Sequence, residues 1–187
     1  MSNEKLEVSK ALELEGSDRF LVGKWALIIL IVSLIMSGYH FYTAGFGLQV
    51  STRTHLIFHL TMGLILVFLL YPIKKGLSQR TIPWYDVLIA LIVAFVGFYI
   101  IQNQQSPSIL SARPTTLDVS MGVALVLLVL EATRRVVGKP LVIIASVFIA
   151  YYFLGSYMPG AFRHVRADFE RFFYEMTYTT AGILEPR

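Results

Sequence analysis

Five long apolar runs constrain this chain more than any other feature of its sequence. Four of them have about 20 residues, enough for an α-helix to cross the hydrocarbon core of a bilayer, and the fourth reaches that length only by continuing from Leu130 through Glu131, Arg134 and Arg135. Because a bilayer offers no water to the backbone, such runs must bond internally as helices. Of the 187 residues, 56% are hydrophobic and 15% are charged, against about 25% charged residues in a soluble domain. We therefore predict an all-α membrane protein with about five transmembrane helices.

Residues that start or stop helices set the span boundaries. Pro72 stops the second span, Pro83 suits the first turn of the third, and Thr115 or Thr116 can cap the fourth. The predicted spans are residues 22–42, 54–71, 84–102, 117–137 and 140–157. A solvated polar tail, residues 1–20, precedes the membrane domain of residues 21–160, and a tail of residues 161–187 follows it.

Basic residues alternate between the two sides. The N-terminal tail and the loops after the second and fourth spans are rich in them, whereas the loops after the first and third spans have one each, Arg53 and Arg113. Because basic loops stay in the cytoplasm, the N-terminus is predicted inside. Five spans then place the C-terminus on the outer side.

The C-terminal tail has an amphipathic pattern. Apolar residues recur there at spacings of three and four, which predicts a helix with one apolar face; they are Phe162, Val165, Phe169, Phe172 and Met176. This face suits either the outer membrane surface or a partner protein, and the sequence leaves both open.

The sharpest local feature is a charged group inside the fourth span: Glu131, Arg134 and Arg135. Ionisable residues within spans are costly and usually functional. Glu131 can pair with either arginine, and both arginines can extend to the inner headgroups. Three interpretations compete: a substrate or ion site, a contact to another subunit or an anionic lipid, and a self-paired interfacial cluster. The position near the inner end of the span favours the last two.

Other polar residues have simpler interpretations. Asp86 and Asp118 lie in the first turns of their helices, which predicts capping. His55 and His59 share a helix face, and His40 ends the first span on the same side. A metal site, a haem site or a proton relay is one interpretation of these histidines. Interfacial hydrogen bonding is favoured, because no carboxylate is near them in the sequence. Close helix contacts are predicted from small residues four apart: Ser33 with Ser37, and Ser120 with Ala124.

The sequence also excludes several chemistries. Without cysteine there is no disulfide, thiolate metal site or cysteine nucleophile. The common metalloprotease, serine hydrolase and phosphate-loop motifs do not occur. We predict neither an enzyme nor a nucleic-acid-binding protein, since cytoplasmic loops account for the net charge of +4. We expect no metal or cofactor in this chain.

The helix ends carry a series of short sequence blocks. The series resembles the small, Q-type membrane part of tripartite ATP-independent periplasmic (TRAP) transporter permeases of the TAXI type. It covers roughly residues 50–182. The blocks are Phe58-His59-Leu60-Thr61, Leu70-Tyr71-Pro72, Ile82-Pro83-Trp84-Tyr85-Asp86, Arg113-Pro114-Thr115-Thr116-Leu117-Asp118, Leu130-Glu131-Ala132-Thr133-Arg134-Arg135-Val136-Val137-Gly138 and Met158-Pro159-Gly160.

The resemblance implies a static scaffold in the bacterial inner membrane. A large M-type subunit would hold the substrate and Na⁺ sites and move as an elevator, importing organic acids or amino acids from a periplasmic binding protein. The expected contacts of the small subunit to that partner or to membrane lipids are Glu131, Arg134, Arg135, Asp118 and Arg113, with a less supported outer group of His40, Arg53, His55 and His59. The chain would be a separate subunit or the N-terminal part of a fusion.

Two alternatives remain open. One is a haem-bearing electron carrier using His40 with His55 or His59 from two helices. The other is a membrane adaptor without a transport role.

Overall fold

The computed structural model describes residues 19, 21–48, 50–73, 81–106, 109, 112–163 and 168–179, which are helical and contain no strand. Their long helices are α2 (Lys24–Phe46), α3 (Thr52–Leu70), α4 (Trp84–Asn103), α6 (Thr116–Val136) and α7 (Lys139–Leu154). The turns η1 (Gly155–Tyr157) and η2 (Gly160–Phe162) and helix α8 (Phe169–Tyr178) follow. Five helices, with α7 extended through η1, are long and apolar enough to cross a membrane. The predicted fold class is confirmed, and the chain is a multi-pass membrane protein.

Glycines set two of the helix boundaries. The first helix runs to Phe46 rather than to the predicted Tyr42, and Gly47 ends it with φ 76°. Gly138, with φ 108°, makes the short turn between α6 and α7. Both φ values lie in the left-handed region that glycine adopts without a steric cost.

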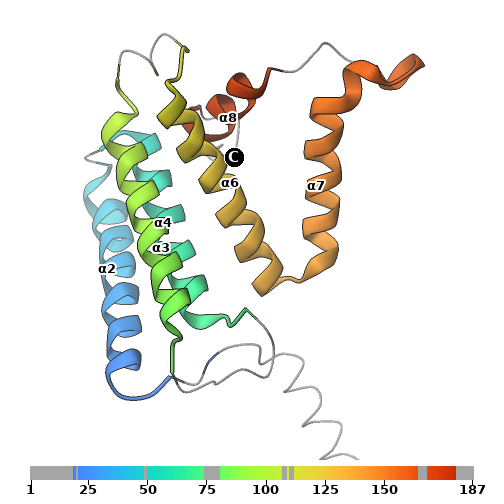
Figure 1. The fold of residues 1–187 in the computed structure, drawn as a ribbon. Coiled ribbons are helices and arrows are strands. Elements are labelled where there is room, and N and C mark those ends of the chain that lie inside the picture. Colours follow the sequence, from blue (N-terminus) through green and yellow to red (C-terminus); the bar gives the residue numbers. More distant parts are fainter. Residues whose placement is uncertain are drawn as a thin grey trace, which may run out of the picture.

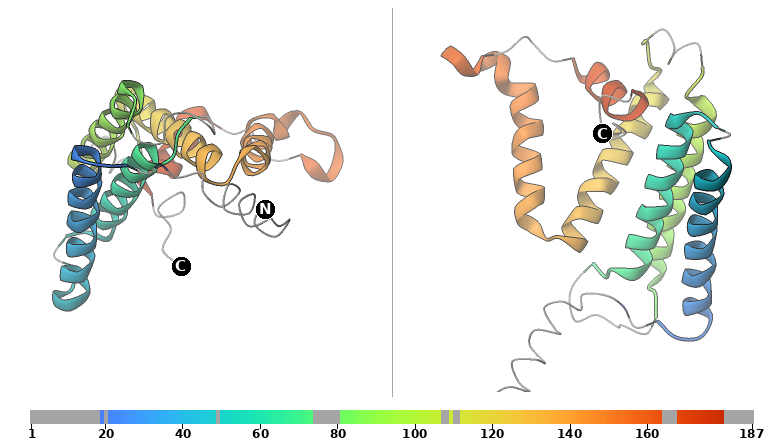
Figure 2. Two further views of the ribbon diagram at one scale, coloured as in Figure 1. Left: turned by 90° about the horizontal axis from the view of Figure 1, so that it is seen from below. Right: turned by 180° about the vertical axis from the view of Figure 1, so that it is seen from behind.

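The helices form a bundle with one divergent member. Helices α2, α3 and α4 lie side by side, and α6 packs against α3 and α4 (Figures 1 and 2). Helix α7 leaves α6 at the Gly138 turn, so that the two form a V (Figure 1). Helix α8 lies near the open end of the V, along the N-terminal half of α6.

The core lies between α3, α4 and α6. Its most deeply buried residues include Phe68, Val93 and Ile100. Helices α3 and α4 approach closely at Gly97, where an added Cβ would stand 2.1 Å from Thr61 Oγ1. By contrast, neither α2 nor α7 contains a buried residue. The three central helices therefore form the packed body, and α2 and α7 are peripheral.

Helix α8 is amphipathic, as predicted, but its main contact is internal. Phe172 and Phe173 are buried against α6, and Phe173 lies over Gly122. The expectation that Phe172 faces a membrane surface or a partner is therefore wrong, because α6 covers it. Phe162 and Phe169 are exposed, and Val165 lies outside the described residues.

Candidate functional site

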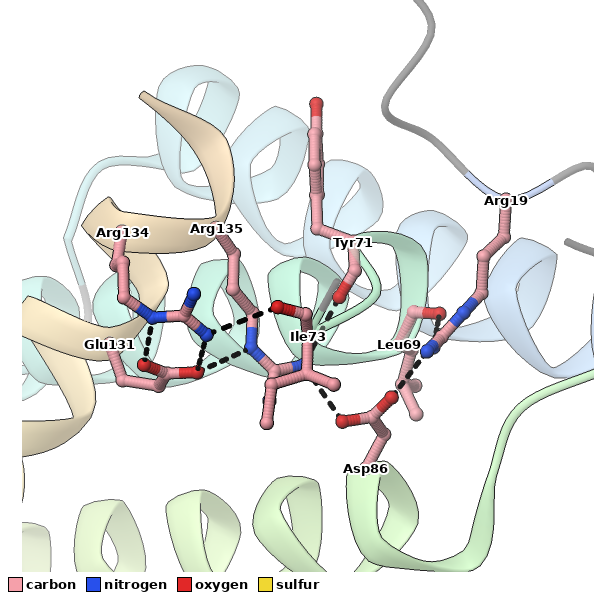
Figure 3. Close-up of polar contacts among 8 residues, drawn as sticks. All are labelled: Arg19, Leu69, Tyr71, Ile73, Asp86, Glu131, Arg134 and Arg135. Atoms are coloured by element: carbon pink, nitrogen blue, oxygen red, sulfur yellow. Dashed lines mark hydrogen bonds and ion pairs between the residues drawn. The ribbon is translucent and has the colours of Figure 1, made fainter. Parts of the chain in front are cut away.

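Charged side chains gather at the end of the bundle where α3 ends and α4 begins (Figure 3). They come from the segment before α2, from the first turn of α4 and from the last turns of α6. We name this group the ion-pair network, and it consists of Arg19, Asp86, Glu131, Arg134 and Arg135.

Asp86 is the centre of the network and is completely buried. Its Oδ1 accepts a hydrogen bond of 2.8 Å from Arg135 Nη1, and its Oδ2 pairs with Arg19. The helix N-cap is Pro83, without a side-chain cap. The prediction that Asp86 serves as a capping residue is therefore wrong. A buried carboxylate is very costly unless cations compensate it, and two guanidinium groups do so here.

Arg135 turns into the protein. Its side chain has no exposed surface, and its guanidinium lies 4.8 Å from the ring centre of Phe68. Besides Asp86, it donates to Glu131 Oε1 at 2.9 Å and to the Tyr71 carbonyl at 3.1 Å. The expectation that Arg135 extends to the headgroups is wrong. The cause is that Asp86 and the carbonyls at the end of α3 need donors at this depth.

Arg134 and Glu131 form the outer part of the network. Arg134 donates through Nε and Nη2 to the two oxygens of Glu131, both at 2.7 Å, and also to the Ile73 carbonyl at 3.3 Å. About a third of each side chain is exposed (30% and 31%). Glu131 thus pairs with both arginines, which confirms the pairing predicted from their spacing. Such bidentate pairs are the strongest arginine–carboxylate contacts.

Arg19 connects the segment before α2 to the end of α3. Its backbone N–H donates to Leu70 O at 2.9 Å, and Nη1 donates to Leu69 O at 3.0 Å. Its side chain is completely buried. The prediction of a solvated tail is therefore wrong at Arg19. Residues 1–18 and 20 lie outside the described part of the chain.

The composition of the network decides what it can do. Three guanidinium groups meet two carboxylates, which leaves one net positive charge. Both carboxylates are already neutralised, so the network is a poor site for a cation. Its bonds join α3, α4 and α6 to Arg19, in the segment before α2. The arrangement is suited to fixing these elements relative to one another.

Asp118 and Arg113 lie at the other end of α6. Thr115 Oγ1 accepts from Asp118 N–H at 3.3 Å, and Asp118 Oδ2 accepts from Thr115 N–H at 2.8 Å, which is a complete capping box. The capping role of Asp118 is confirmed, with Thr115 as the cap. Burial and the charge of Asp118 raise the pKa of Tyr178 on α8. Arg113 is exposed and forms no ion pair with any described residue.

The outer histidines meet between α2 and α3. His40 Nε2 and His59 Nδ1 are 2.8 Å apart, and His55 Nδ1 lies 3.2 Å from the Tyr39 hydroxyl. Two axial haem ligands would stand about 4 Å apart, twice a metal–imidazole bond of about 2.0 Å. The His40–His59 pair does not fit a haem in this arrangement. Within the described ranges, no three His, Cys, Asp or Glu side chains are placed to hold a metal ion.

The sequence did not predict that Arg19 and Asp86 belong to the network. A signal for Asp86 exists in the sequence, because it is the only acidic residue of the third span. An acid at that depth requires a cation from elsewhere in the chain. No comparable signal marks Arg19, which is one of several basic residues before the first span.

No protein-family model, curated protein or solved structure matches this chain. A functional assignment therefore rests on the sequence blocks and on the geometry of the described residues.

Proposed function

We propose that this chain is the small, Q-type membrane subunit or domain of a TRAP transporter of the TAXI type. One observation carries the proposal, namely that sequence blocks far apart in the chain converge in the ion-pair network. Tyr71 comes from the Leu-Tyr-Pro block, Asp86 from the Ile-Pro-Trp-Tyr-Asp block, and Arg135 from the Leu-Glu-Ala-Thr-Arg-Arg block. Three of the six blocks that carry the resemblance thus supply groups that join α3, α4 and α6.

The role we propose is that of a static scaffold. Breaking a buried ion pair by removing one partner costs about 3–5 kcal/mol. The pairs of Asp86 with Arg19 and Arg135 are of this kind, since all three side chains are fully buried. Elements joined in this way keep fixed positions while a moving subunit slides past them. The transport chemistry, including any Na⁺ site, would lie in the large M-type permease subunit.

The peripheral helices offer surface for such a partner. Helices α2 and α7 bury no residue against their own chain. Their exposed side chains are mostly large and apolar, for example Leu34 and Phe41 on α2 and Val147 and Phe148 on α7. Apolar helix faces of this kind pack against either lipid or another membrane helix.

The proposed setting is the bacterial inner membrane. The end of the bundle with the ion-pair network would face the cytoplasm, because the basic loops gather there. Helix α8 would then lie on the periplasmic side, where a binding protein delivers an organic acid or an amino acid.

Co-expression with a large M-type permease subunit tests this proposal. A tag on this chain should recover the permease, and transport in vesicles should require both subunits and the binding protein. A permease that transports at the full rate without this chain would refute the assignment.

The contact role of the charged group needs its own variant. Glu131→Ala, Arg134→Ala and Arg135→Ala together should lower recovery of the permease, whereas Arg171→Ala, in an exposed ion pair on α8, should not. If the triple variant inserts normally and forms an intact, active complex, the network serves no contact between the subunits.

A further inference from the structure

An apolar cavity lies inside the V formed by α6 and α7. Its volume is about 310 Å³, and it is partly open. Three helices contribute its lining, which is almost entirely apolar: Val126, Val129 and Leu130 from α6, Phe148, Ile149 and Tyr152 from α7, and Phe172 and Met176 from α8. In a chain whose α6 and α7 cross a bilayer, such a cavity opens towards lipid rather than water.

The volume indicates which occupant fits. A cavity of about 150 Å³ holds benzene, with its six carbons, so about 310 Å³ has room for roughly a dozen carbons. A single turn of helix occupies about 420 Å³, from a diameter of about 10 Å and a pitch of 5.4 Å. The cavity therefore cannot enclose a turn of a partner helix and is about right for most of one fatty acyl chain.

The vertex of the V supplies a place for the headgroup. Lys139 begins α7, is exposed and forms no ion pair with any described residue. The helix that it begins has no side-chain cap and no acidic residue in its first turn. Its first N–H groups and the lysine together attract a negative charge.

The distance from Lys139 to the cavity matches the length of an acyl chain. Phe148 follows Lys139 by nine residues, which is about 14 Å along a helix at 1.5 Å per residue. Tyr152 is about 6 Å further. A headgroup at Lys139 thus places the middle and end of an extended acyl chain at the cavity.

We propose that this cavity binds one acyl chain of an anionic phospholipid whose phosphate lies at Lys139. Helix α8 closes the far end of the site through Phe172 and Met176. The lipid fills the space that the divergence of α7 leaves against α6. This site is independent of the transporter assignment, because it needs only the bilayer and this chain.

Photocrosslinking tests the site. The full chain is placed in phosphatidylcholine vesicles that contain phosphatidylglycerol with a diazirine near the end of one acyl chain. Crosslinks should map to the cavity segments of α6 and α7, and unlabelled phosphatidylglycerol should compete for them. Ile149→Trp, which fills part of the cavity with a larger side chain, should lower their yield to that of ordinary bilayer contacts, by excluding the acyl chain sterically.

Val147→Trp is the matched control, because Val147 is exposed on the same helix and does not line the cavity. It should leave the yield unchanged. Val129→Phe provides a second filling variant if Ile149→Trp does not fold. For the headgroup, Lys139→Gln should remove the preference for phosphatidylglycerol over phosphatidylcholine carrying the same diazirine chain.

Three results would overturn the proposal. Crosslinks spread evenly over α2 and α7 and insensitive to both filling variants would indicate ordinary bilayer lipid. Equal yields from the two headgroups, unaffected by Lys139→Gln, would remove the anionic phosphate from the site. Loss of the cavity crosslinks when the large permease is co-purified would assign the space to a protein partner.

Discussion

Asp86, at the start of α4, and Arg135, at the end of α6, form a fully buried ion pair with an Oδ1–Nη1 distance of 2.8 Å (Figure 3). The pair joins two transmembrane helices at the same depth. Arg19 compensates the other carboxylate oxygen, and Glu131 accepts from the other side of the Arg135 guanidinium. Asp86 and Arg135 are therefore each held in place by further charged groups of the network.

Arg135→Ala should destabilise the protein by about 3–5 kcal/mol, because it leaves a buried charge poorly compensated. Unfolding in mixed micelles measures the loss. The matched control is Arg171→Ala, since Arg171 is mostly exposed in its pair with Glu175 and such pairs contribute little. A double-mutant cycle with Asp86→Asn should show coupling between the two positions. Additive effects would mean that the pair does not join the helices.

Gly97→Ala should weaken the packing of α3 against α4 by about 1–3 kcal/mol, the usual cost of overpacking. The new Cβ would stand 2.1 Å from Thr61 Oγ1. Gly63→Ala on α3 is the control, because a Cβ there meets nothing within 4 Å. Thr61→Ala should restore part of the loss, although the Thr61 Cβ stays within 2.9 Å. Equal stability of the two glycine variants would contradict the close approach.

Gly122→Leu should displace α8 from α6. A Cβ at this position already lies 2.9 Å from Thr177 Oγ1 and 3.2 Å from Phe173 Cβ. Since the chain has no cysteine, Thr177→Cys can report on the contact. Maleimide labelling of this buried position should be slow with Gly122 and fast with Gly122→Leu. Gly38→Leu, at an open position, should leave labelling slow, and unchanged labelling in Gly122→Leu would argue against the packing.

Tyr178 should make the protein sensitive to alkali. Burial, and secondly the charge of Asp118, raise the pKa of Tyr178 above its ordinary value of 10.0. Its contribution to stability is fully present below the unfolded pKa of about 10. It is lost as the pH rises further, since the unfolded state then gives up a proton that the folded state keeps. Tyr178→Phe should reduce the fall in melting temperature between pH 8 and 11, measured in detergent, whereas Tyr157→Phe, at an exposed site, should not.

Single cysteines can test the orientation. Ser51→Cys lies between α2 and α3, and Lys139→Cys lies at the start of α7, next to the turn that follows α6. If the basic loops are cytoplasmic, an impermeant maleimide added to intact cells should label the first and not the second. Labelling of Lys139→Cys alone would invert the topology, and labelling of both would contradict the span assignment.

The spans were predictable from the sequence because hydropathy is a local property. Each helix depends on its own run of apolar residues and its own stop signals, so that the observed bounds differ from the predicted ones mainly at Phe46. The ion pairing of Glu131 with Arg134 and Arg135 was predictable for the same reason, since the residues lie within one turn.

The contacts between helices were not predictable. Asp86 pairs with Arg19 and Arg135, which are 67 and 49 residues away. Its position in the first turn of a helix had instead predicted a capping role. Small residues show the same limit. Ser37 and Ser120 fitted a helix-contact spacing but are exposed, while Gly97 and Gly122 form the close approaches. In the same way, the apolar pattern of α8 revealed a face but not that α6 covers it.

The ion-pair network also implies an order of assembly. The ribosome makes Arg19 before it makes α4. It makes Arg135 later, 49 residues after Asp86. When α4 enters the bilayer, Arg19 is therefore the one guanidinium partner of Asp86 that already exists. The carboxylate can be neutralised from the N-terminal side at that moment, and α6 completes the arrangement when it arrives. Arg19 would thus first neutralise Asp86 while α4 inserts into the bilayer, and afterwards stabilise the folded protein.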